Sequence, residues 1–309
     1  MKYIITGGAG FIGSHIAEYL SSRGDEVIIF DNLFSGKKQN IHHLLGKKTV
    51  TFVEGSITDL QTLKKMTDGV DGIFHEAAIA SVPRSLKNPL ATNEANVQGT
   101  LNVLLAARDC GVKKVVFASS SSVYGDTPVL PKQEDMKPLP ISPYAVSKLA
   151  GEYYCRVFSS AYHIPTVCLR YFNVFGPRQD PLSEYAAVIP RFITRILKNQ
   201  PPVIYGDGEQ SRDFTFIRDV VQANIRAMER EVEGVFNIAY GEQHTLNELA
   251  STIMDLTGTT MDPVFETARQ GDVRHSLADI RAARSLLGYT PEYTFRSGLQ
   301  ETVSWFQKQ

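Results

Sequence analysis

Tyr144 and Lys148 are four residues apart in the segment Tyr-Ala-Val-Ser-Lys, which places both on one face of a helix about one turn apart. A tyrosine hydroxyl has an ordinary pKa of about 10, so it is a poor base near neutral pH unless a neighbouring ammonium stabilises the phenolate. The pair therefore indicates acid–base chemistry. A surface tyrosine beside a solvated lysine is the alternative interpretation of the spacing alone.

Four consecutive serines, Ser119 to Ser122, follow the apolar run Lys-Val-Val-Phe-Ala and precede Val-Tyr-Gly. Open α/β sheets place their chemistry at the carboxyl ends of strands. The run can also be read as a plain polar loop, but the Tyr144/Lys148 pair further along the chain favours the catalytic interpretation.

A glycine-rich turn, Gly7-Gly8-Ala9-Gly10-Phe11-Ile12-Gly13, follows an apolar run and opens a helical pattern. Glycines at Gly7, Gly10 and Gly13 allow a tight turn and close approach of the backbone to a pyrophosphate. Asp31 ends the next apolar run, where its carboxylate can accept ribose hydroxyls and would repel a 2′-phosphate. These features predict NAD as cofactor rather than NADP.

The elements that must position these residues alternate along the first half of the chain. Apolar runs at 2–6, 26–31, 50–55, 72–78 and 114–121 read as strands, separated by helical patterns near 11–23, 59–67 and 90–110. This order predicts an α/β fold with a doubly wound parallel Rossmann sheet in a domain over 1–170, joined by part of 213–238. Looser Pro- and Gly-rich segments predict a smaller C-terminal substrate-binding domain over 171–309.

The composition excludes several other classes of protein. The 309 residues carry a formal net charge of -1 with no basic tract, so neither a nucleic acid nor a membrane surface is expected as a partner. Cys110, Cys155 and Cys168 lack metal-ligand spacing, so we expect reduced thiols in a cytoplasmic protein and no metal site. No segment approaches the roughly 20 apolar residues needed to cross a bilayer.

With these motifs the whole chain resembles the extended short-chain dehydrogenase/reductases of the NAD-dependent epimerase/dehydratase family, in the nucleotide-sugar branch. The resemblance implies that Ser120 is the hydroxyl partner of Tyr144, and that Lys148 lowers the tyrosine pKa and grips the nicotinamide ribose. The adenine-side Asp usual in the family is Ser56 here, which leaves that contact to the backbone of Ile57. Further implied cofactor contacts are Phe11, Ile12, Asn32, Ser35, Gly36, Ala77, Ala78, Asn96 and Tyr171.

The second half resembles the UDP-sugar epimerases, most closely those for N-acetylated sugars. The motifs are the segments 170–179, 185–190, 205–208 and 211–214. In such enzymes Asn173 and Arg212 meet the diphosphate, Tyr205 lies by the uracil, and Arg269 with Asp272 binds the diphosphate and the uridine ribose. The full set of implied substrate contacts is Ser81, Ser121, Ser122, Asn173, Val188, Tyr205, Arg212, Arg269, Asp272 and Ser276.

These parts imply a UDP-hexose 4-epimerase. The Tyr144 phenolate removes the 4-hydroxyl proton while the C4 hydride passes to NAD, and the 4-keto sugar turns over before the hydride returns to its other face. A dehydratase would need an acid/base pair where Ser121 and Ser122 stand. A UDP-glucuronate 4-epimerase or decarboxylase is the nearest rival. A non-catalytic NAD-binding sensor is disfavoured by the intact Ser120, Tyr144 and Lys148.

Two finer expectations concern the sugar and the assembly. A residue four positions after Asp272 gates the space for the C2 substituent in this family, and the small Ser276 there, with Ala80, predicts that UDP-GlcNAc and UDP-GalNAc are interconverted, with UDP-Glc and UDP-Gal as further candidates. The resemblance also implies a homodimer through the helix near 90–110 and the one from Tyr144 to about 162. Both helices carry surplus apolar residues: Leu101, Val103, Leu104, Leu105, Tyr153, Tyr154, Val157 and Phe158.

Overall fold

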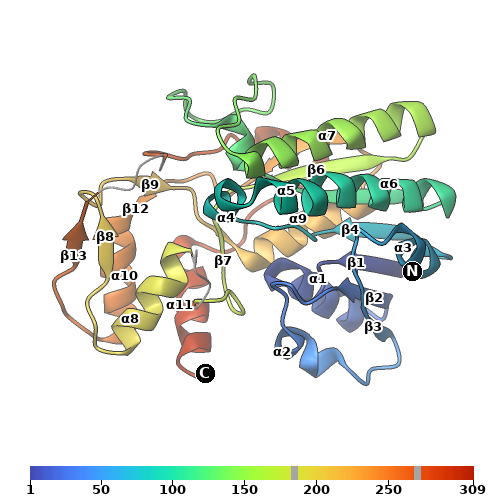
Figure 1. The fold of residues 1–309 in the computed structure, drawn as a ribbon. Helices are drawn as coiled ribbons and strands as arrows, with labels where there is room; N and C mark the ends of the chain where they lie inside the picture. The colour runs from blue at the N-terminus through green and yellow to red at the C-terminus, as the bar shows by residue number, and fades with distance from the viewer. Residues whose placement is uncertain (182–186, 268–272) are drawn as a thin grey trace.

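A parallel sheet of seven strands forms the larger part of the molecule (Figure 1). The computed structural model describes residues 1–181, 187–267 and 273–309. The strand order of the sheet is β11-β6-β5-β4-β1-β2-β3. The chain adds strands to one side of β1 as far as β3 and then to the other side from β4 onward, which is typical of a doubly wound sheet. The predicted α/β Rossmann fold is therefore confirmed. The strands are β1 (Lys2–Thr6), β2 (Glu26–Asp31), β3 (Val50–Glu54), β4 (Gly72–His75), β5 (Lys114–Ser120), β6 (Thr166–Tyr171) and β11 (Gly234–Ile238).

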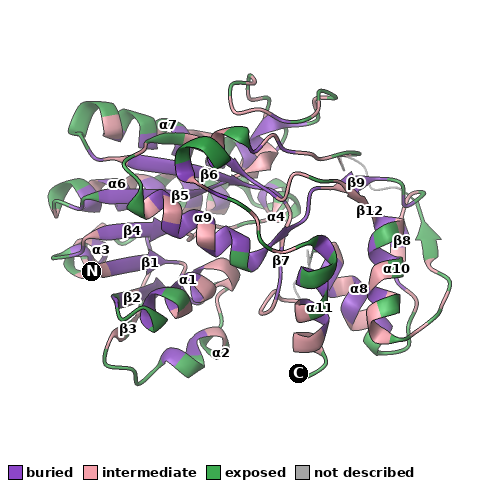
Figure 2. Cartoon of the chain, turned by 180° about the vertical axis from the view of Figure 1, so that it is seen from behind, coloured by how far each residue is buried: buried purple, intermediate pink, exposed green. Residues whose placement is uncertain are grey.

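Helices cover both faces of the sheet, and each face has its own hydrophobic core (Figure 2). Successive strand residues point to opposite faces, so Ile4 belongs to one core and its neighbour Ile5 to the other. Helices α1 (Phe11–Ser22) and α9 (Ile217–Glu229) pack on the Ile5 side. Helices α3 (Leu60–Thr67), α6 (Gly99–Asp109) and α7 (Pro143–Tyr162) pack on the Ile4 side. Short α2 (Lys38–Ile41) follows β2.

The helix predicted near 90–110 consists of three pieces. Helix α5 (Pro89–Asn93) passes into a widened π turn (Glu94–Gln98) and then into α6. Widened turns of this kind mark local constraints and occur often at functional sites. The constraint here is the buried Asn96, whose side chain donates to Ser147 in α7 at 2.9 Å and accepts from the Ile79 amide at 2.8 Å.

A smaller part of the chain lies beyond the sheet (Figure 1). It contains α8 (Val188–Leu197), α10 (Leu246–Thr257) and α11 (Phe295–Phe306). Two-stranded pairs complete it: β8 (Val203–Tyr205) with β13 (Val264–Glu266), and β9 (Ser211–Arg212) with β12 (His244–Thr245). A third pair, β7 (Val174–Phe175) with β10 (Thr215–Phe216), marks where the chain leaves and re-enters the large part. Helix α9 and strand β11 then return to the sheet, and β11 pairs with β6.

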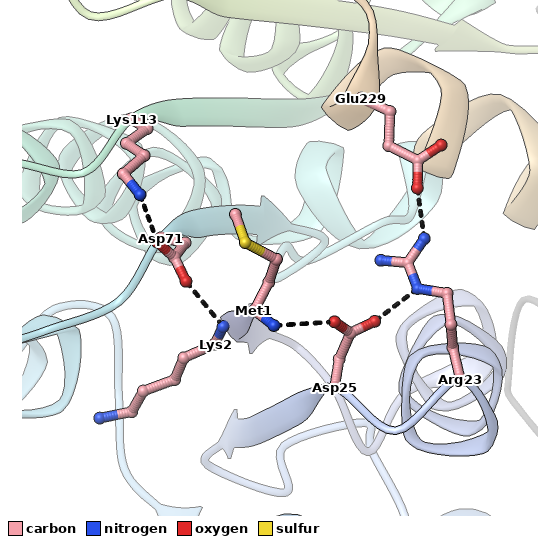
Figure 3. A network of polar contacts seen from close by, with 7 residues as sticks. All are labelled: Met1, Lys2, Arg23, Asp25, Asp71, Lys113 and Glu229. Carbon is pink, nitrogen blue, oxygen red and sulfur yellow. Dashed lines mark hydrogen bonds and ion pairs between the residues drawn. The ribbon is translucent and has the colours of Figure 1, made fainter.

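A polar network ties together the amino-terminal edge of the sheet (Figure 3). Asp25 accepts from the chain's amino terminus at 3.1 Å and from Arg23, which also pairs with Glu229 of α9. Asp71 accepts from the Lys2 amide at 2.9 Å and from Lys113. These contacts anchor the edge of the sheet opposite to the carboxyl ends of the strands. Among the described helices, none has the length and apolar character required to span a membrane.

Candidate active site

Helix α7 carries the Tyr/Lys pair, and its local sequence fixes where the helix starts and how closely it approaches the sheet. Ser142 caps the helix by accepting from the Ala145 amide at 3.1 Å, and a proline occupies the first helical position. Gly151 lies against the ring of Phe117 in β5, and a Cβ at this position would come within 2.4 Å of the ring. The glycine therefore lets α7 lie directly on β5, beside the serine run.

Tyr144, Lys148 and Ser120 meet at the carboxyl end of β5. Ser120 lies near enough to Tyr144 for its side chain to lower the pKa of the Tyr144 hydroxyl. The ammonium of Lys148 donates to the Ala118 carbonyl at 2.6 Å and lies 6.0 Å from the centre of the Tyr144 ring. The structure thus brings together the three residues predicted to be catalytic, on the elements that the sequence predicted for them.

Burial has the largest effect on the electrostatics of this group, and the carboxylate of Glu76 acts on both Tyr144 and Lys148. Burial raises the pKa of Tyr144, the Ser120 side chain partly lowers it, and the charge of Glu76 raises it again. Burial lowers the pKa of Lys148 to about 8, and Glu76 opposes that shift. A direct lowering of the Tyr144 pKa by Lys148 stays a prediction, because the lysine is hydrogen-bonded to a backbone carbonyl here.

A buried ion pair supports the serine run from beneath. Ser119 donates to Glu152 of α7, which also accepts two hydrogen bonds from Arg170 of β6, each 2.8 Å long. This orients Ser119 away from the site. The Ser120 hydroxyl accepts from the Ser122 amide at 3.2 Å. The Ser122 hydroxyl oxygen is buried with no hydrogen-bond partner in the described part of the chain, so it suits a ligand hydroxyl. Ser121 lies between them, partly exposed.

The glycine turn has the shape that a dinucleotide pyrophosphate requires. Gly7 has a φ of +71°, and a Cβ there would come within 2.7 Å of the Ala77 backbone. A Cβ on Gly13 would lie 2.4 Å from the Gly7 carbonyl oxygen. Helix α1 starts after Gly10 without a side-chain cap, which leaves the first amides of the helix, at Phe11 and Ile12, for an anion.

Asp31 faces the same turn from the end of β2. Its carboxylate accepts from the Ala9 amide at 2.9 Å and the Leu33 amide at 2.8 Å. Burial raises its pKa, and these two hydrogen bonds counteract the shift. A carboxylate has about four acceptor positions, so capacity remains for ribose hydroxyls.

The loop after β2 carries the next group of predicted cofactor contacts. Asn32 accepts from the Phe34 amide at 3.1 Å, and the amide of Lys37 donates to the Ala9 carbonyl. These bonds fold Ser35 and Gly36 back over the glycine turn, beside Asp31.

On the adenine side predicted from the family, two residues already have protein partners. The Ser56 hydroxyl is bonded to that of Thr58 at 2.8 Å, and the Ile57 carbonyl accepts from Asn102 at 3.0 Å.

The end of β4 completes the cofactor side. Asn96 fixes the segment that follows Ala77 and Ala78, because it bonds to both the amide and the carbonyl of Ile79. Tyr171, at the end of β6, donates to Glu76 at 2.9 Å. We did not predict Glu76 as a site residue. The available signal was an acidic residue directly after an apolar strand, next to two predicted contacts.

The smaller part of the chain contributes the predicted substrate residues. Arg212 donates to the backbone carbonyls of Ser211 and Arg274, at 2.9 and 3.1 Å. The Ser276 amide donates to the same Ser211 carbonyl at 3.1 Å, so Ser276 and Arg212 lie close together. Asn173 donates to the Asp213 carbonyl at 3.3 Å.

The remaining predicted substrate contacts are more dispersed. The Arg191 guanidinium lies 5.6 Å from the centre of the Tyr205 ring. Val188 is the first residue of α8. The Ser81 hydroxyl caps α4 (Val82–Lys87) by accepting from the Arg84 amide at 3.2 Å. Arg269 and Asp272 lie outside the described residues.

Within the described residues no group of three or more metal-ligating side chains occurs.

A cavity of about 640 Å³ lies between the start of α2, residues 178–181 and the ends of α8 and α11. Its lining residues do not belong to the predicted site.

The apolar residues cited for a dimer differ in their burial. Leu101, Leu105 and Tyr154 are partly buried and pack against the protein's own core. Val103, Leu104 and Phe158 are buried in the protein's own core, so they are not surplus. Tyr153 and Val157 of α7 are each more than half exposed, which keeps this helix as the candidate interface.

Comparison with known proteins extends over the whole chain. The family model described as NAD dependent epimerase/dehydratase family matches residues 3–239. The UDP-glucose 4-epimerase of Mycolicibacterium smegmatis is 38% identical over 310 residues, covering 99% of each chain. The structure of a UDP-N-acetylglucosamine 4-epimerase from Methanobrevibacter ruminantium M1 superposes with a TM-score of 0.96 at 44% identity, over 100% of this chain and 98% of that one.

A third structure is a Bacillus cereus UDP-glucuronic acid 4-epimerase in complex with UDP-glucuronic acid and NAD. It has a TM-score of 0.93 at 33% identity, over 100% of this chain and 99% of that one. Together with the glycine turn and the Ser120–Tyr144–Lys148 group, these matches identify the chain as a member of the NAD-dependent epimerase/dehydratase family, with NAD as its cofactor.

Proposed function

We propose that the protein is a UDP-hexose 4-epimerase that interconverts UDP-GlcNAc and UDP-GalNAc and also accepts UDP-Glc and UDP-Gal. The observation that carries the proposal is the convergence of Tyr144, Lys148 and Ser120 at the end of β5, beside the unpartnered hydroxyl of Ser122. NAD, when bound, takes a hydride from C4 of the sugar and returns it. The names of the relatives from M. ruminantium and M. smegmatis support the same reaction class.

The residues of the chain have distinct roles on this proposal. Tyr144 takes the proton of the 4-hydroxyl as base and gives it back as acid, while Ser120 holds the sugar oxygen. Lys148 contributes the positive charge that favours the phenolate once the site is closed from water. Ser121 and Ser122 face the sugar. Because neither is an Asp or Glu, the site lacks the acid/base pair that would expel water from the sugar.

The sugar diphosphate is held by the smaller part of the chain on this proposal. Residues 171–309, apart from α9 and β11, form the substrate-binding region, with Arg212 and Asn173 on the diphosphate and Tyr205 by the uracil. Guanidinium groups suit phosphate oxygens because their fork of donors matches them. Ser276 leaves room for an N-acetyl group. The Ser276 amide and the Arg212 guanidinium both donate to the Ser211 carbonyl, which supports a position of Ser276 near the substrate.

A UDP-glucuronate 4-epimerase is the second candidate, because the B. cereus enzyme of that name is 33% identical over the whole chain. The two candidates differ in the group at C6 of the sugar. A carboxylate there needs donors facing it, and the unpartnered Ser122 hydroxyl is one such donor. The substrate panel below separates them.

The test incubates the purified protein separately with UDP-GlcNAc, UDP-GalNAc, UDP-Glc, UDP-Gal and UDP-glucuronate, and separates the products by chromatography. We expect C4 isomers from the N-acetylated pair. Tyr144→Phe removes only the base, so it should retain NAD and lose about 10²- to 10⁴-fold in rate. Conversion of UDP-glucuronate alone would favour the second candidate, and wild-type turnover in Tyr144→Phe would contradict the proposed role of Tyr144.

A further inference from the structure

Glu76 is a carboxylate that the proposed reaction does not use, although its charge acts on both Tyr144 and Lys148. It follows β4 directly, and its backbone packs against the glycine turn, since a Cβ on Gly7 would lie 2.9 Å from the Glu76 carbonyl carbon. Tyr171 of β6 donates to Glu76 Oε1 at 2.9 Å. Asn224 of α9 donates in turn to the Tyr171 hydroxyl at 2.8 Å. The carboxylate is therefore held in one orientation from two other elements.

Two ionisable side chains that interact with Glu76 through its charge come from one helix, α7. Lys148 and Tyr144 of α7 both interact with it electrostatically. The adjacent His75 points to the opposite face of the sheet, where its ring bonds to Thr6 and Thr100 at 2.7 and 2.9 Å. Burial lowers the pKa of His75 to about 3, so that ring is neutral. Lys148 is therefore the sole cation that acts on Glu76 among the described residues, and its ammonium is bonded to the Ala118 carbonyl.

A structural role does not require this negative charge. A glutamine would accept the same hydrogen bond from Tyr171, without the cost of a charge in a largely buried place. A carboxylate is useful there if a positive charge enters the site. The residues around Glu76, namely Tyr144, Lys148, Ala77, Ala78 and Tyr171, are those expected to contact NAD, whose nicotinamide ring is positive in the oxidised form and neutral in the reduced form.

We propose that Glu76 sets the charge balance of the cofactor site, so that the protein binds NAD in preference to NADH. The proposal rests on the proposed NAD-dependent function and adds a residue to it. An epimerase must hold oxidised cofactor between turnovers, and a fixed carboxylate stabilises the form with the extra positive charge. Glu76 acts on the cofactor through its charge and transfers no proton to the sugar.

The test lets NAD and NADH compete for the protein at a series of ratios and reads bound NADH by fluorescence after gel filtration. Glu76→Gln keeps an acceptor for Tyr171 and removes the charge. We expect the affinity ratio of NAD to NADH to fall about tenfold or more, because unit charges a few ångströms apart interact at least that strongly in a protein interior. Glu26→Gln, an exposed carboxylate at the start of β2, is the matched control and should leave the ratio unchanged.

The dependence on pH gives a second readout that a purely structural role would not alter. Burial raises the pKa of Glu76 to about 7, against the opposing effects of Tyr171 and Lys148. The wild-type preference for NAD should therefore weaken as the pH falls below about 7, whereas the Glu76→Gln ratio should stay flat over that range, in which Lys148 is charged in both proteins. Tyr171→Phe, measured at about pH 8 where the carboxylate is charged, should keep most of the preference.

The outcomes separate this inference from the proposed function. If Glu76→Gln binds both cofactor forms with the wild-type ratio, the role of Glu76 is wrong while the epimerase proposal stands. If the wild-type protein binds neither form, the proposed function itself fails. If Glu76→Gln has a lower affinity ratio of NAD to NADH than the wild-type protein, and that ratio does not change with pH, the inference is supported.

Discussion

The ion pair beneath the serine run offers a sharp test of how the fold supports the site. Glu152 and Arg170 have side chains that are each 4% exposed, and they form two parallel hydrogen bonds of 2.8 Å. Arg170 also lies over the ring of Tyr124, with its guanidinium carbon 4.7 Å from the ring centre. The substitution Glu152→Leu would leave this guanidinium buried without its counterion and Ser119 without its acceptor.

The expected cost follows from that burial. Removing one partner of a buried pair costs about 3–5 kcal/mol, whereas replacing both partners by apolar residues of similar volume is often close to neutral. Glu152→Leu should therefore lower Tm by roughly 6–10 °C at about 2 °C per kcal/mol. The double variant Glu152→Leu/Arg170→Met should recover most of the loss. Because Ser119 adjoins Ser120, the single variant should also lose epimerase activity.

The assay is thermal unfolding followed by circular dichroism, with turnover measured on the same protein preparations. Glu301→Gln is the control, because Glu301 forms a partly exposed pair with Arg218 at 2.7 Å, and surface pairs contribute about 0–1 kcal/mol. If Glu152→Leu costs no more than this control, or if the double variant is as unstable as the single one, the pair does not act as the buried support described here.

Three further predictions concern the cofactor, the assembly and the sugar. Gly13→Ala should abolish NAD retention, since its Cβ would lie 2.4 Å from the Gly7 carbonyl oxygen; stoichiometric NAD in the purified variant would contradict this. The wild-type protein should be a homodimer in light scattering, and Tyr153→Glu with Val157→Glu should make it monomeric, because charges would enter the apolar face of α7. Ser276→Tyr should selectively slow the N-acetylated pair, by the equivalent of about 1–3 kcal/mol; equal slowing of both sugar pairs would show that residue 276 is not the gate.

Local patterns were sufficient to predict the elements of the sheet and the cofactor turn. The strand runs are apolar because helices cover both faces, and a glycine turn between a strand and a helix has few other interpretations. The spacing of Tyr144 and Lys148 requires only a helix, which is a local structure. Their pairing with Ser120 of the serine run was implied by the resemblance to the NAD-dependent epimerase/dehydratase family.

The sequence by itself thus determined the fold and the glycine turn, because both depend on contacts between residues near in the chain or on sheet topology. The family resemblance predicted that Ser120, Tyr144 and Lys148 form one site. Tertiary structure alone decided what surrounds that group. Glu76 meets Tyr171 across 95 positions of sequence, and Glu152 meets Arg170 between a helix and a strand. The π turn at Asn96 likewise depends on Ser147 of another helix. Such partners are chosen by packing between distant segments, for which a single sequence has no local periodicity.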